Sequence, residues 1–296
     1  MSLSKYLFGW RKSTLETYVI AYNKYGGSVN LHPDIIAFIM RRKKTTIDFW
    51  HYEAEGEVVA AYFKVNKKDI GCNLWREYPL SYDEVKIPMK ECMKVWLPER
   101  CNRLSPYNAN NIINTLNQYS EKRRICYAKD SFSNKTKKKR LGEKKRFIDN
   151  GGEIYELNNL SHNELAEIYV RLFKMRFGDK VQCYNKNKIA DMASELNHLI
   201  YGTVLFFNRE PCAIDLVWRA ESDKTIYFDV PNGGVNPKYL DYSPGSIVMW
   251  ENINNAKAEC IIKSKEMCFS IGLYENNWDY KLRWAEPKSL GKVLFI

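Results

Sequence analysis

The sequence lacks the features on which several large classes of protein depend. It has only four histidines, and its eight cysteines form no C-x-x-C pair and no histidine–cysteine spacing typical of zinc ligands. We therefore expect no metal site, and free thiols in a reducing compartment rather than a disulfide framework. No G-x-S-x-G, P-loop or dinucleotide-binding pattern is present, so these enzyme classes are not indicated.

Long apolar runs are also missing. The longest, such as TVLFF and CAIDLVW, have the length of strands and fall short of the about 18 residues that a spanning helix needs. The N-terminus, MSLSKYLFGWRK, has neither the apolar core nor the small-residue cleavage site of a signal peptide. We expect a cytoplasmic protein, and attachment to the surface of the inner membrane remains open.

Acidic residues are scarce in one segment. The chain has 46 Lys and Arg against 35 Asp and Glu, for a net charge of +11, and the segment 122–146 supplies almost all of that excess. These cations could hold the protein to anionic lipid at about 1 kcal/mol each, bind the phosphates of tRNA, or form a solvated helix between domains. No motif indicates sequence-specific DNA binding. The candidate basic surface comprises Lys137, Lys138, Lys139, Arg140, Lys144 and Lys145.

The 296 residues, 45% hydrophobic and 27% charged, suit a folded α/β protein of two domains. We place an N-terminal domain in residues 1–120, a basic helical linker in 121–150 and a C-terminal domain in 151–296. The C-terminal half has the clearer pattern, since Ser161 and Glu164 form a capping box and glycines end its helices. It predicts helices over 137–149, 161–178, 187–200 and 243–260, strands over 152–157, 225–234 and 267–272, and two strands within 202–220 that are joined by a polar turn at 208–210.

The N-terminal half gives a fainter version of the same order. A capping box of Ser13 and Glu16 opens a helix that ends at Gly26, and a short helix follows over 34–40. Residues 48–65 read as a hairpin broken at Gly56, and residues 108–118 as a helix. The similar placement of hairpins in the two halves hints at an internal duplication.

Four segments carry a resemblance to a known family: YGGSVNLHPDI (25–35), NELAEIYVRLFKMRFG (163–178), YFDVPNGGVNPKYLDYSPGSIVMWENI (227–253) and FSIGLYENNWDYKLRW (269–284). They closely resemble the Mig-14 family of macrophage-inducible proteins, and the likeness runs from Gly9 to Trp284. The resemblance implies a role in virulence and in resistance to cationic antimicrobial peptides in a Gram-negative bacterium. It implies no particular reaction.

That family in turn resembles the tandem GNAT proteins of the Fem type, which join amino acids to cell-envelope precursors. The implied fold is a pair of GNAT-like domains, each a mixed sheet flanked by helices. The closing Y-K-x-x-W motif is present as Tyr280, Lys281 and Trp284. In Fem-type enzymes the lysine matching Lys281 is thought to stabilise negative charge at the acyl carbonyl. Lys281 and Tyr280 are therefore catalytic candidates.

The same segment concentrates aromatic and charged residues that could form a wall against a ligand. Tyr274, Trp278 and Arg283 are the substrate-binding candidates there. The alternative is a packed C-terminal hairpin held by an ion pair between Asp279 and Arg283.

Asp229 is the third catalytic candidate because it interrupts an apolar and aromatic strand. Burial there would raise its pKa and suit it to act as a general base toward an amine. Alternatively it pairs with Arg176 or Lys281, or accepts hydrogen bonds from the turn at 232–234. Arg176 is also a substrate-binding candidate.

Ser243 and Gly245 open a helix at the place where GNAT enzymes bind the pyrophosphate of coenzyme A. Ser243 is predicted to cap this helix, and its N-terminus would attract anions. However, the flanking Arg or Gln and the second glycine of the GNAT signature are missing, so a capped core helix is the alternative.

Two functions follow from these observations. The first is acyl or aminoacyl transfer to an envelope precursor, with coenzyme A or aminoacyl-tRNA as possible donor, by a protein peripheral to the inner membrane. The second is a GNAT-like protein without catalysis that binds lipid or partners at that membrane, and transcriptional regulation is a weaker third.

Overall fold

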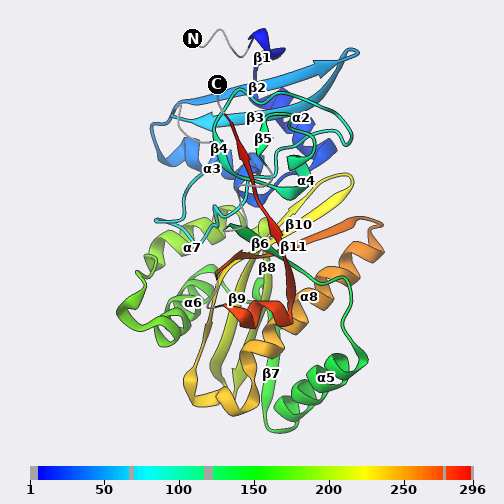
Figure 1. The fold of residues 1–296 in the computed structure, drawn as a ribbon. Coiled ribbons are helices and arrows are strands. Elements are labelled where there is room, and N and C mark those ends of the chain that lie inside the picture. The colour runs from blue at the N-terminus through cyan, green and yellow to red at the C-terminus, as the bar shows by residue number, and fades with distance from the viewer. Residues whose placement is uncertain (1–5, 67–69, 117–122, 276–277, 295–296) are drawn as a thin grey trace.

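The computed structural model describes residues 6–66, 70–116, 123–275 and 278–294 (Figure 1). The N-terminal region contains two small sheets. The first has the order β1-β2-β3 and packs against helix α2, which also contacts α3; the second has the order β4-β13-β5. The elements are β1 (Trp10–Ser13), α2 (Leu15–Tyr25), η1 (Val29–Leu31), α3 (Pro33–Arg42), β2 (Ile47–Ala54), β3 (Glu57–Val65), β4 (Cys101–Leu104), α4 (Pro106–Ala109), β5 (Thr115–Leu116) and β13 (Gly291–Val293).

A seven-stranded sheet of order β12-β6-β11-β10-β9-β8-β7 forms the rest of the molecule. Its neighbouring strands are antiparallel except β10 and β11, which are parallel because helix α8 connects them. The strands are β6 (Arg124–Ala128), β7 (Gly152–Glu156), β8 (Ile200–Phe207), β9 (Glu210–Glu221), β10 (Thr225–Val235), β11 (Glu266–Tyr274) and β12 (Ala285–Ser289).

Helices cover both faces of this sheet. Helices α6 and α7 pack with alternate residues of β9, such as Ile214 and Leu216, whereas α8 packs with Val217 and with Phe228 of β10. Helix α5 lies beside α8 and β7, at the end of the molecule remote from the N-terminal region (Figure 1). The bounds are α5 (Asn134–Asp149), η3 (Leu157–Asn159), α6 (His162–Phe177), η4 (Gly178–Lys180), α7 (Lys186–Glu195), η5 (Asn197–Leu199), η6 (Pro237–Tyr242), α8 (Pro244–Ile262) and η7 (Asp279–Arg283).

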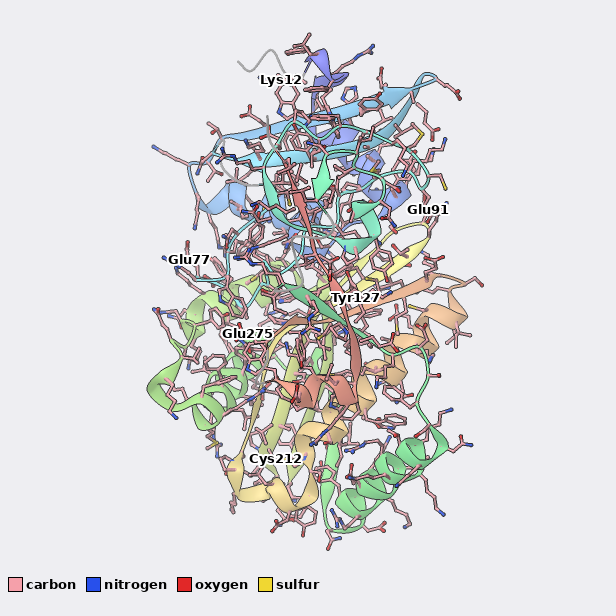
Figure 2. All side chains as sticks on the ribbon, viewed as in Figure 1. Lys12, Glu77, Glu91, Tyr127, Cys212 and Glu275 are labelled. Atoms are coloured by element: carbon pink, nitrogen blue, oxygen red, sulfur yellow. The ribbon has the colours of Figure 1, made fainter. Side chains whose placement is uncertain are left out.

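The N-terminal region packs directly on the large sheet, on the same face as α6. One hydrophobic core runs across the junction, and Trp218 Nε1 donates to the carbonyl of Pro79 at 2.6 Å. Tyr127 of β6 lies at this junction (Figure 2). Near its C-terminal end the chain crosses back, because β13 inserts between β4 and β5. The two regions are therefore joined by extensive packing as well as by the chain.

The predicted mixed α/β fold and the β-α-α-β-β-β-α-β order of the C-terminal half are confirmed. The capping box of Ser161 and Glu164 is present at the start of α6, with Gly178 at its end. For the N-terminal half, the prediction from the sequence was wrong at two points. Thr14, not Ser13, caps α2, because Ser13 is the last residue of β1.

The predicted helix over residues 108–118 is also wrong, since α4 ends at Ala109. Asn108 and Asn114 use their side-chain amides to pair with the backbone of Ile87 and Leu97. Such side-chain bonds compete with helix formation.

Within the described parts of the chain, no helix is both long enough and apolar enough to span a bilayer.

Candidate functional site

The parallel strands β10 and β11 pair only along their first halves. The register runs from Thr225↔Glu266 to Asp229↔Ser270, and beyond it both strands have bulges. We call the space between residues 230–233 of β10 and 271–274 of β11 the strand gap. Backbone groups that face such a gap lose their ladder partners and need others.

Lys281 of η7 supplies partners for two of these groups. Its Nζ donates to the carbonyls of Ile271 at 2.7 Å and Leu273 at 2.6 Å, although the side chain is only 7% exposed. Burial lowers the pKa of Lys281, and the nearby Asp83 opposes that shift. The Trp278 ring stands 4.6 Å from the ammonium. Two of the three N–H donors are thus used, and the third has no partner among the described residues.

Asp83 reaches the same point from the N-terminal region. Its Oδ2 accepts a hydrogen bond from the Leu273 N–H at 3.2 Å. Gly272 lies between the two charges: a Cβ there would stand 3.0 Å from Asp83 Oδ2 and 3.4 Å from Lys281 Nζ. Its φ of +79° also favours glycine. The bulge therefore allows a carboxylate and an ammonium to approach one backbone position.

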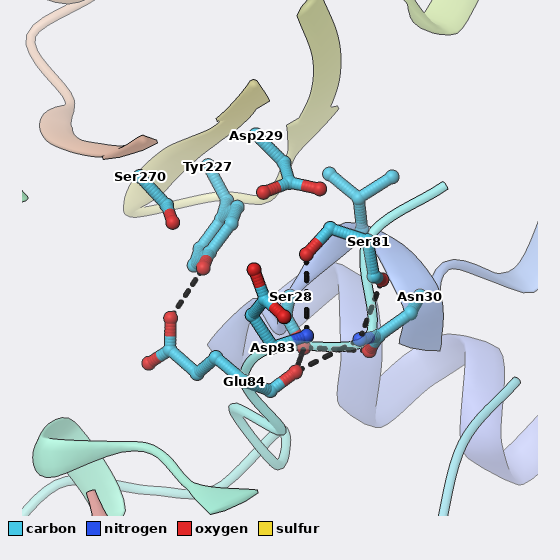
Figure 3. A pocket seen from close by; sticks show the side chains of 9 residues that line it. Ser28, Asn30, Ser81, Asp83, Glu84, Tyr227, Asp229 and Ser270 are labelled. Atoms are coloured by element: carbon cyan, nitrogen blue, oxygen red, sulfur yellow. Dashed lines mark hydrogen bonds between the residues drawn. The ribbon is translucent and has the colours of Figure 1, made fainter. Parts of the chain in front are cut away.

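Asp229 and Ser270, the last paired residues of the two strands, face the loop that carries Ser81, Asp83 and Glu84 (Figure 3). Burial raises the pKa of Asp229 well above its usual value, and the charges of Asp83 and Glu84 raise it further. The backbone of Ser81 donates a hydrogen bond to Asp229 and opposes this shift. Asp229 is therefore a stronger base than an exposed aspartate.

Glu84 has a different role in this cluster. Its two carboxylate oxygens accept hydrogen bonds from the hydroxyls of Tyr127 and Tyr227, and the latter bond is drawn in Figure 3. Burial raises the pKa of Glu84, against the effect of these bonds. The glutamate thus fastens the N-terminal loop to β6 and β10.

The other side of the gap is lined by Arg176, at the end of α6. Its guanidinium donates to the carbonyl of Gly233 at 2.9 Å and hydrogen-bonds the hydroxyl of Tyr280. Asp215 of β9 stands opposite Gly233, and burial raises the pKa of this carboxyl to about 7. The buried amide of Asn252, on α8, lies beside Asp215. Charged and polar groups thus meet the gap from both faces of the sheet.

The structure brings four of the candidate residues together: Lys281, Tyr280, Asp229 and Arg176 all lie at the strand gap. The alternative expectation was that Asp229 forms an ion pair with Arg176 or Lys281. In the structure both cations instead donate hydrogen bonds to backbone carbonyls. Trp278 contacts Lys281 and is partly exposed.

Tyr274 and Arg283 lie further out. The Tyr274 hydroxyl donates to Asp279 at 2.7 Å, and the Arg124 guanidinium stacks on its ring. The alternative prediction was an ion pair between Asp279 and Arg283. In the structure Asp279 instead accepts the hydrogen bond from Tyr274, and Arg283 is exposed on η7.

The start of α8 does not fit the pyrophosphate of coenzyme A. Ser243 adopts a left-handed backbone (φ 56°) and its side chain caps nothing, so its predicted capping role is wrong. Pro244 has no N–H, and the N–H groups of Ser246 and Ile247 both donate to the Ser243 carbonyl. In this fully described turn only the N–H of Gly245 remains free, whereas a phosphate cradle needs several.

The basic segment forms helix α5, but not all of its cations are on the surface. Arg140 is buried, pairs with Glu143 at 2.6 Å and packs on the Trp284 ring, so its assignment to the basic surface is wrong. Lys144 is half-buried and pairs with Glu251. The remaining candidates are exposed: Lys137, Lys138, Lys139 and Lys145.

The prediction from the sequence did not include several residues of the site. Ser81, Asp83 and Glu84 belong to no motif, and Asp215 lies in an apolar strand much as Asp229 does. The one usable signal was the polar stretch SYDE between apolar residues. In the described part of the chain, no group of three or more His, Cys, Asp or Glu side chains is placed to hold a metal ion.

Comparisons with known proteins agree on the fold. A family model described as Mig-14 matches residues 32–293. The crystal structure of FemX superposes with a TM-score of 0.60 and 7% identity, covering 97% of each chain. A conserved protein of unknown function from Bacteroides thetaiotaomicron VPI-5482 gives 0.52 and 11% identity, covering 97% of this chain and all of the other. A tandem GNAT protein from the clavulanic acid biosynthesis pathway covers 96% of each chain with 8% identity, but its TM-score of 0.44 is too low to support an inference. Curated proteins gave no match.

Proposed function

The chain belongs to the Mig-14 family, and we propose that it transfers an acyl or aminoacyl group to an amine of a cell-envelope precursor. The modified envelope would resist cationic antimicrobial peptides and so favour the virulence of the Gram-negative bacterium that carries the protein. The observation that carries the proposal is the meeting of Asp83, Asp229 and Lys281 at the strand gap.

Each of these groups has a chemical part in such a transfer. An amine arrives as an ammonium, and the acidic cluster of Asp83 and Asp229 attracts it. Asp229, whose pKa is raised, takes a proton from the attacking nitrogen. As the C–N bond forms, the remaining N–H of Lys281 donates to the carbonyl oxygen, where negative charge develops. The bond to the donor's leaving atom then breaks, and that atom keeps the electron pair and takes up the second proton that the nitrogen loses. The proton on Asp229 passes to solvent.

The donor is more consistent with aminoacyl-tRNA than with coenzyme A. The first turn of α8 offers one free N–H, which is a poor cradle for a pyrophosphate. The exposed lysines of α5 would instead attract the phosphates of a nucleic acid.

A transfer assay tests the proposal. Purified protein is incubated with a lipid extract of Gram-negative envelopes and either labelled acetyl-CoA or tRNA charged with labelled amino acids. We expect label to pass from the charged tRNA to an amine-bearing lipid product, detected by mass spectrometry. Asp229→Asn should slow this transfer by about 100-fold or more, because a positioned base contributes about 10²–10⁴.

Asp223→Asn is the matched control, since Asp223 is exposed in the turn before β10 and should keep full activity. Absence of transfer from both donors, together with unchanged peptide resistance in the Asp229→Asn strain, would overturn the catalytic proposal. The alternative, a binding protein without catalysis at the inner membrane, would then hold.

A second proposal concerns attachment to an anionic membrane surface through α5. Its exposed side presents Lys137, Lys138 and Lys145 beside Leu141, 56% exposed, and Ile148, 47% exposed. Apolar side chains among lysines on one helix side suit the boundary between lipid headgroups and acyl chains. The helix also lies at one end of the molecule, where a flat surface can reach it (Figure 1).

Vesicle flotation measures this attachment. Replacing Lys137, Lys138 and Lys145 together by Gln should weaken binding to phosphatidylglycerol-containing vesicles by about 100-fold, since each lysine contributes about 1 kcal/mol. The control variant replaces three exposed lysines elsewhere, Lys174, Lys180 and Lys186, and should bind like the wild type. Equal binding of the two triple variants to the vesicles would contradict the proposal that α5 attaches the protein to an anionic membrane.

A further inference from the structure

A cavity at the junction of the two regions lies at the other end of the paired strands. It opens where β10 and β11 begin, at Lys224 and Glu266, whereas the strand gap lies where they separate. Its volume is about 90 Å³, several times the about 10–15 Å³ that one water molecule needs. The wall is contributed by residues 86–91 and 107–111 of the N-terminal region and by the first residues of both strands.

The inner wall of the cavity contains one charged side chain, Lys86. It is 92% buried, because only 8% of its surface is exposed. The rest of the inner wall combines apolar and aromatic side chains with the buried polar residues Asn108 and Thr225. Its ammonium stands 5.0 Å from the centre of the Tyr107 ring, and Tyr107 lines the cavity too. Ile87, Met89 and Met267 contribute apolar side chains to the same wall.

Among the described residues, no hydrogen bond or ion pair of the Lys86 ammonium is found besides its contact with the Tyr107 ring. Its charge lowers the pKa of the buried Glu84, against the larger effect of burial, and also acts on the Cys268 thiol. Both oxygens of Glu84 are taken by the hydroxyls of Tyr127 and Tyr227. A stacked ring offsets only part of the cost of burying an ammonium, since a buried charge normally has an anion and hydrogen bonds as partners.

We propose that this cavity binds a small organic anion, with its carboxylate or phosphate on Lys86 and an apolar body against Ile87, Met89, Met267 and Tyr107. The anion supplies the counter-charge and the acceptors that the protein does not, and the apolar wall favours a hydrocarbon chain or ring. Glu91, at the outer edge of the N-terminal region (Figure 2), and Glu266 stand at the exposed rim. With Lys224 beside them the rim carries two acids and one base, so an anion reaches Lys86 only if its apolar part enters the cavity.

Binding is tested with hexanoate, hexyl phosphate and hexanol, which share a chain length and differ in the head group. Titration into wild-type protein labelled at the methionine methyl groups should shift the NMR signals of Met89 and Met267 with hexanoate or hexyl phosphate, and not with hexanol. Whichever of the two anions binds more tightly identifies the head group. Shifts caused equally by hexanol, or no saturable shift at those two methionines, would overturn the proposal.

Variants of Lys86 separate a ligand site from a structural lysine. Lys86→Met should weaken binding of the preferred anion by about tenfold or more, while Lys86→Arg keeps most of it. The ligand-free Lys86→Met protein should melt at the same temperature as the wild type or a few degrees higher, because a buried unpaired charge is removed. A lower melting temperature with unchanged anion binding would show that Lys86 serves the fold. Lys12→Met, at an exposed lysine of β1, should change neither quantity.

Discussion

Lys281→Met is expected to reduce the rate of the proposed transfer by about 10²–10³, the loss seen when one donor to a developing oxyanion is removed. Methionine is unbranched like the aliphatic part of lysine, but its side chain ends before the ammonium position and has no N–H. It therefore cannot donate to the acyl carbonyl oxygen, and it also leaves the carbonyls of Ile271 and Leu273 without their present partner. Each such buried acceptor costs about 1–3 kcal/mol of stability.

Lys281→Gln separates these two effects. Its amide can still donate to the carbonyls in the strand gap, so more of the free energy of unfolding should be retained than in Lys281→Met. Its lack of charge should still slow the transfer. Initial rates and urea denaturation, measured on both variants, give the two quantities. Lys174→Met, on the exposed side of α6, is the control that should match the wild type.

The outcome that would contradict the role of Lys281 is a Lys281→Met protein that is folded and transfers at the wild-type rate. Peptide resistance in cells carrying this variant should fall together with the rate. If resistance persists while transfer is lost, the phenotype depends on binding and not on catalysis.

Gly234→Ala is expected to destabilise the protein by about 3 kcal/mol or more. Helix α6 packs directly on this glycine: a Cβ there would stand 2.4 Å from the carbonyl carbon of Leu172 and 2.7 Å from the nitrogen of Phe173. These are backbone atoms and cannot turn aside, so the helix must move away from the sheet. Overpacking of a core usually costs about 1–3 kcal/mol, and a displaced helix adds the burial that it loses.

Gly142→Ala is the matched control, because Gly142 lies in the exposed part of α5 and a Cβ there meets nothing within 4 Å. Alanine should stabilise that helix by about 1 kcal/mol, since glycine is a poor helix former. Both variants are compared by their midpoints of thermal unfolding. A Gly234→Ala midpoint within 2 °C of the wild type would contradict the close packing of α6 on β10.

Local signals explain why the C-terminal half was predicted well. The Ser161–Glu164 box and Gly178 set the ends of α6 through contacts between residues three to five positions apart. Hairpins such as β8–β9 follow from alternating patterns and a short polar turn. The helix expected over 108–118 failed because its asparagines bond to backbone groups that are distant in sequence. The spacing of apolar residues within 108–118 gives no information about these distant hydrogen-bond partners.

The candidate site was predictable only in part, and for the same reason. Lys281 and Tyr280 stood out through the family resemblance, Asp229 through its place in an apolar strand, and Arg176 as a possible partner of Asp229. The acids that raise the pKa of Asp229 were not foreseen. Glu84 meets Tyr227 across 143 positions of sequence, and Asp83 meets Leu273 across 190.

By itself the sequence determined the order of the helices and strands in the C-terminal half, the ends of the helices with strong caps, and the position of the excess positive charge. Those properties depend on neighbours along the chain. Only the tertiary structure showed that Arg140 is buried against Trp284, that Lys281 donates to two carbonyls of β11 at the strand gap and that Lys86 faces a cavity without a counter-charge. The reason is physical. Whether a charged side chain is solvated, paired or buried without a partner depends on which distant segments pack around it, and only the folded chain brings those segments together.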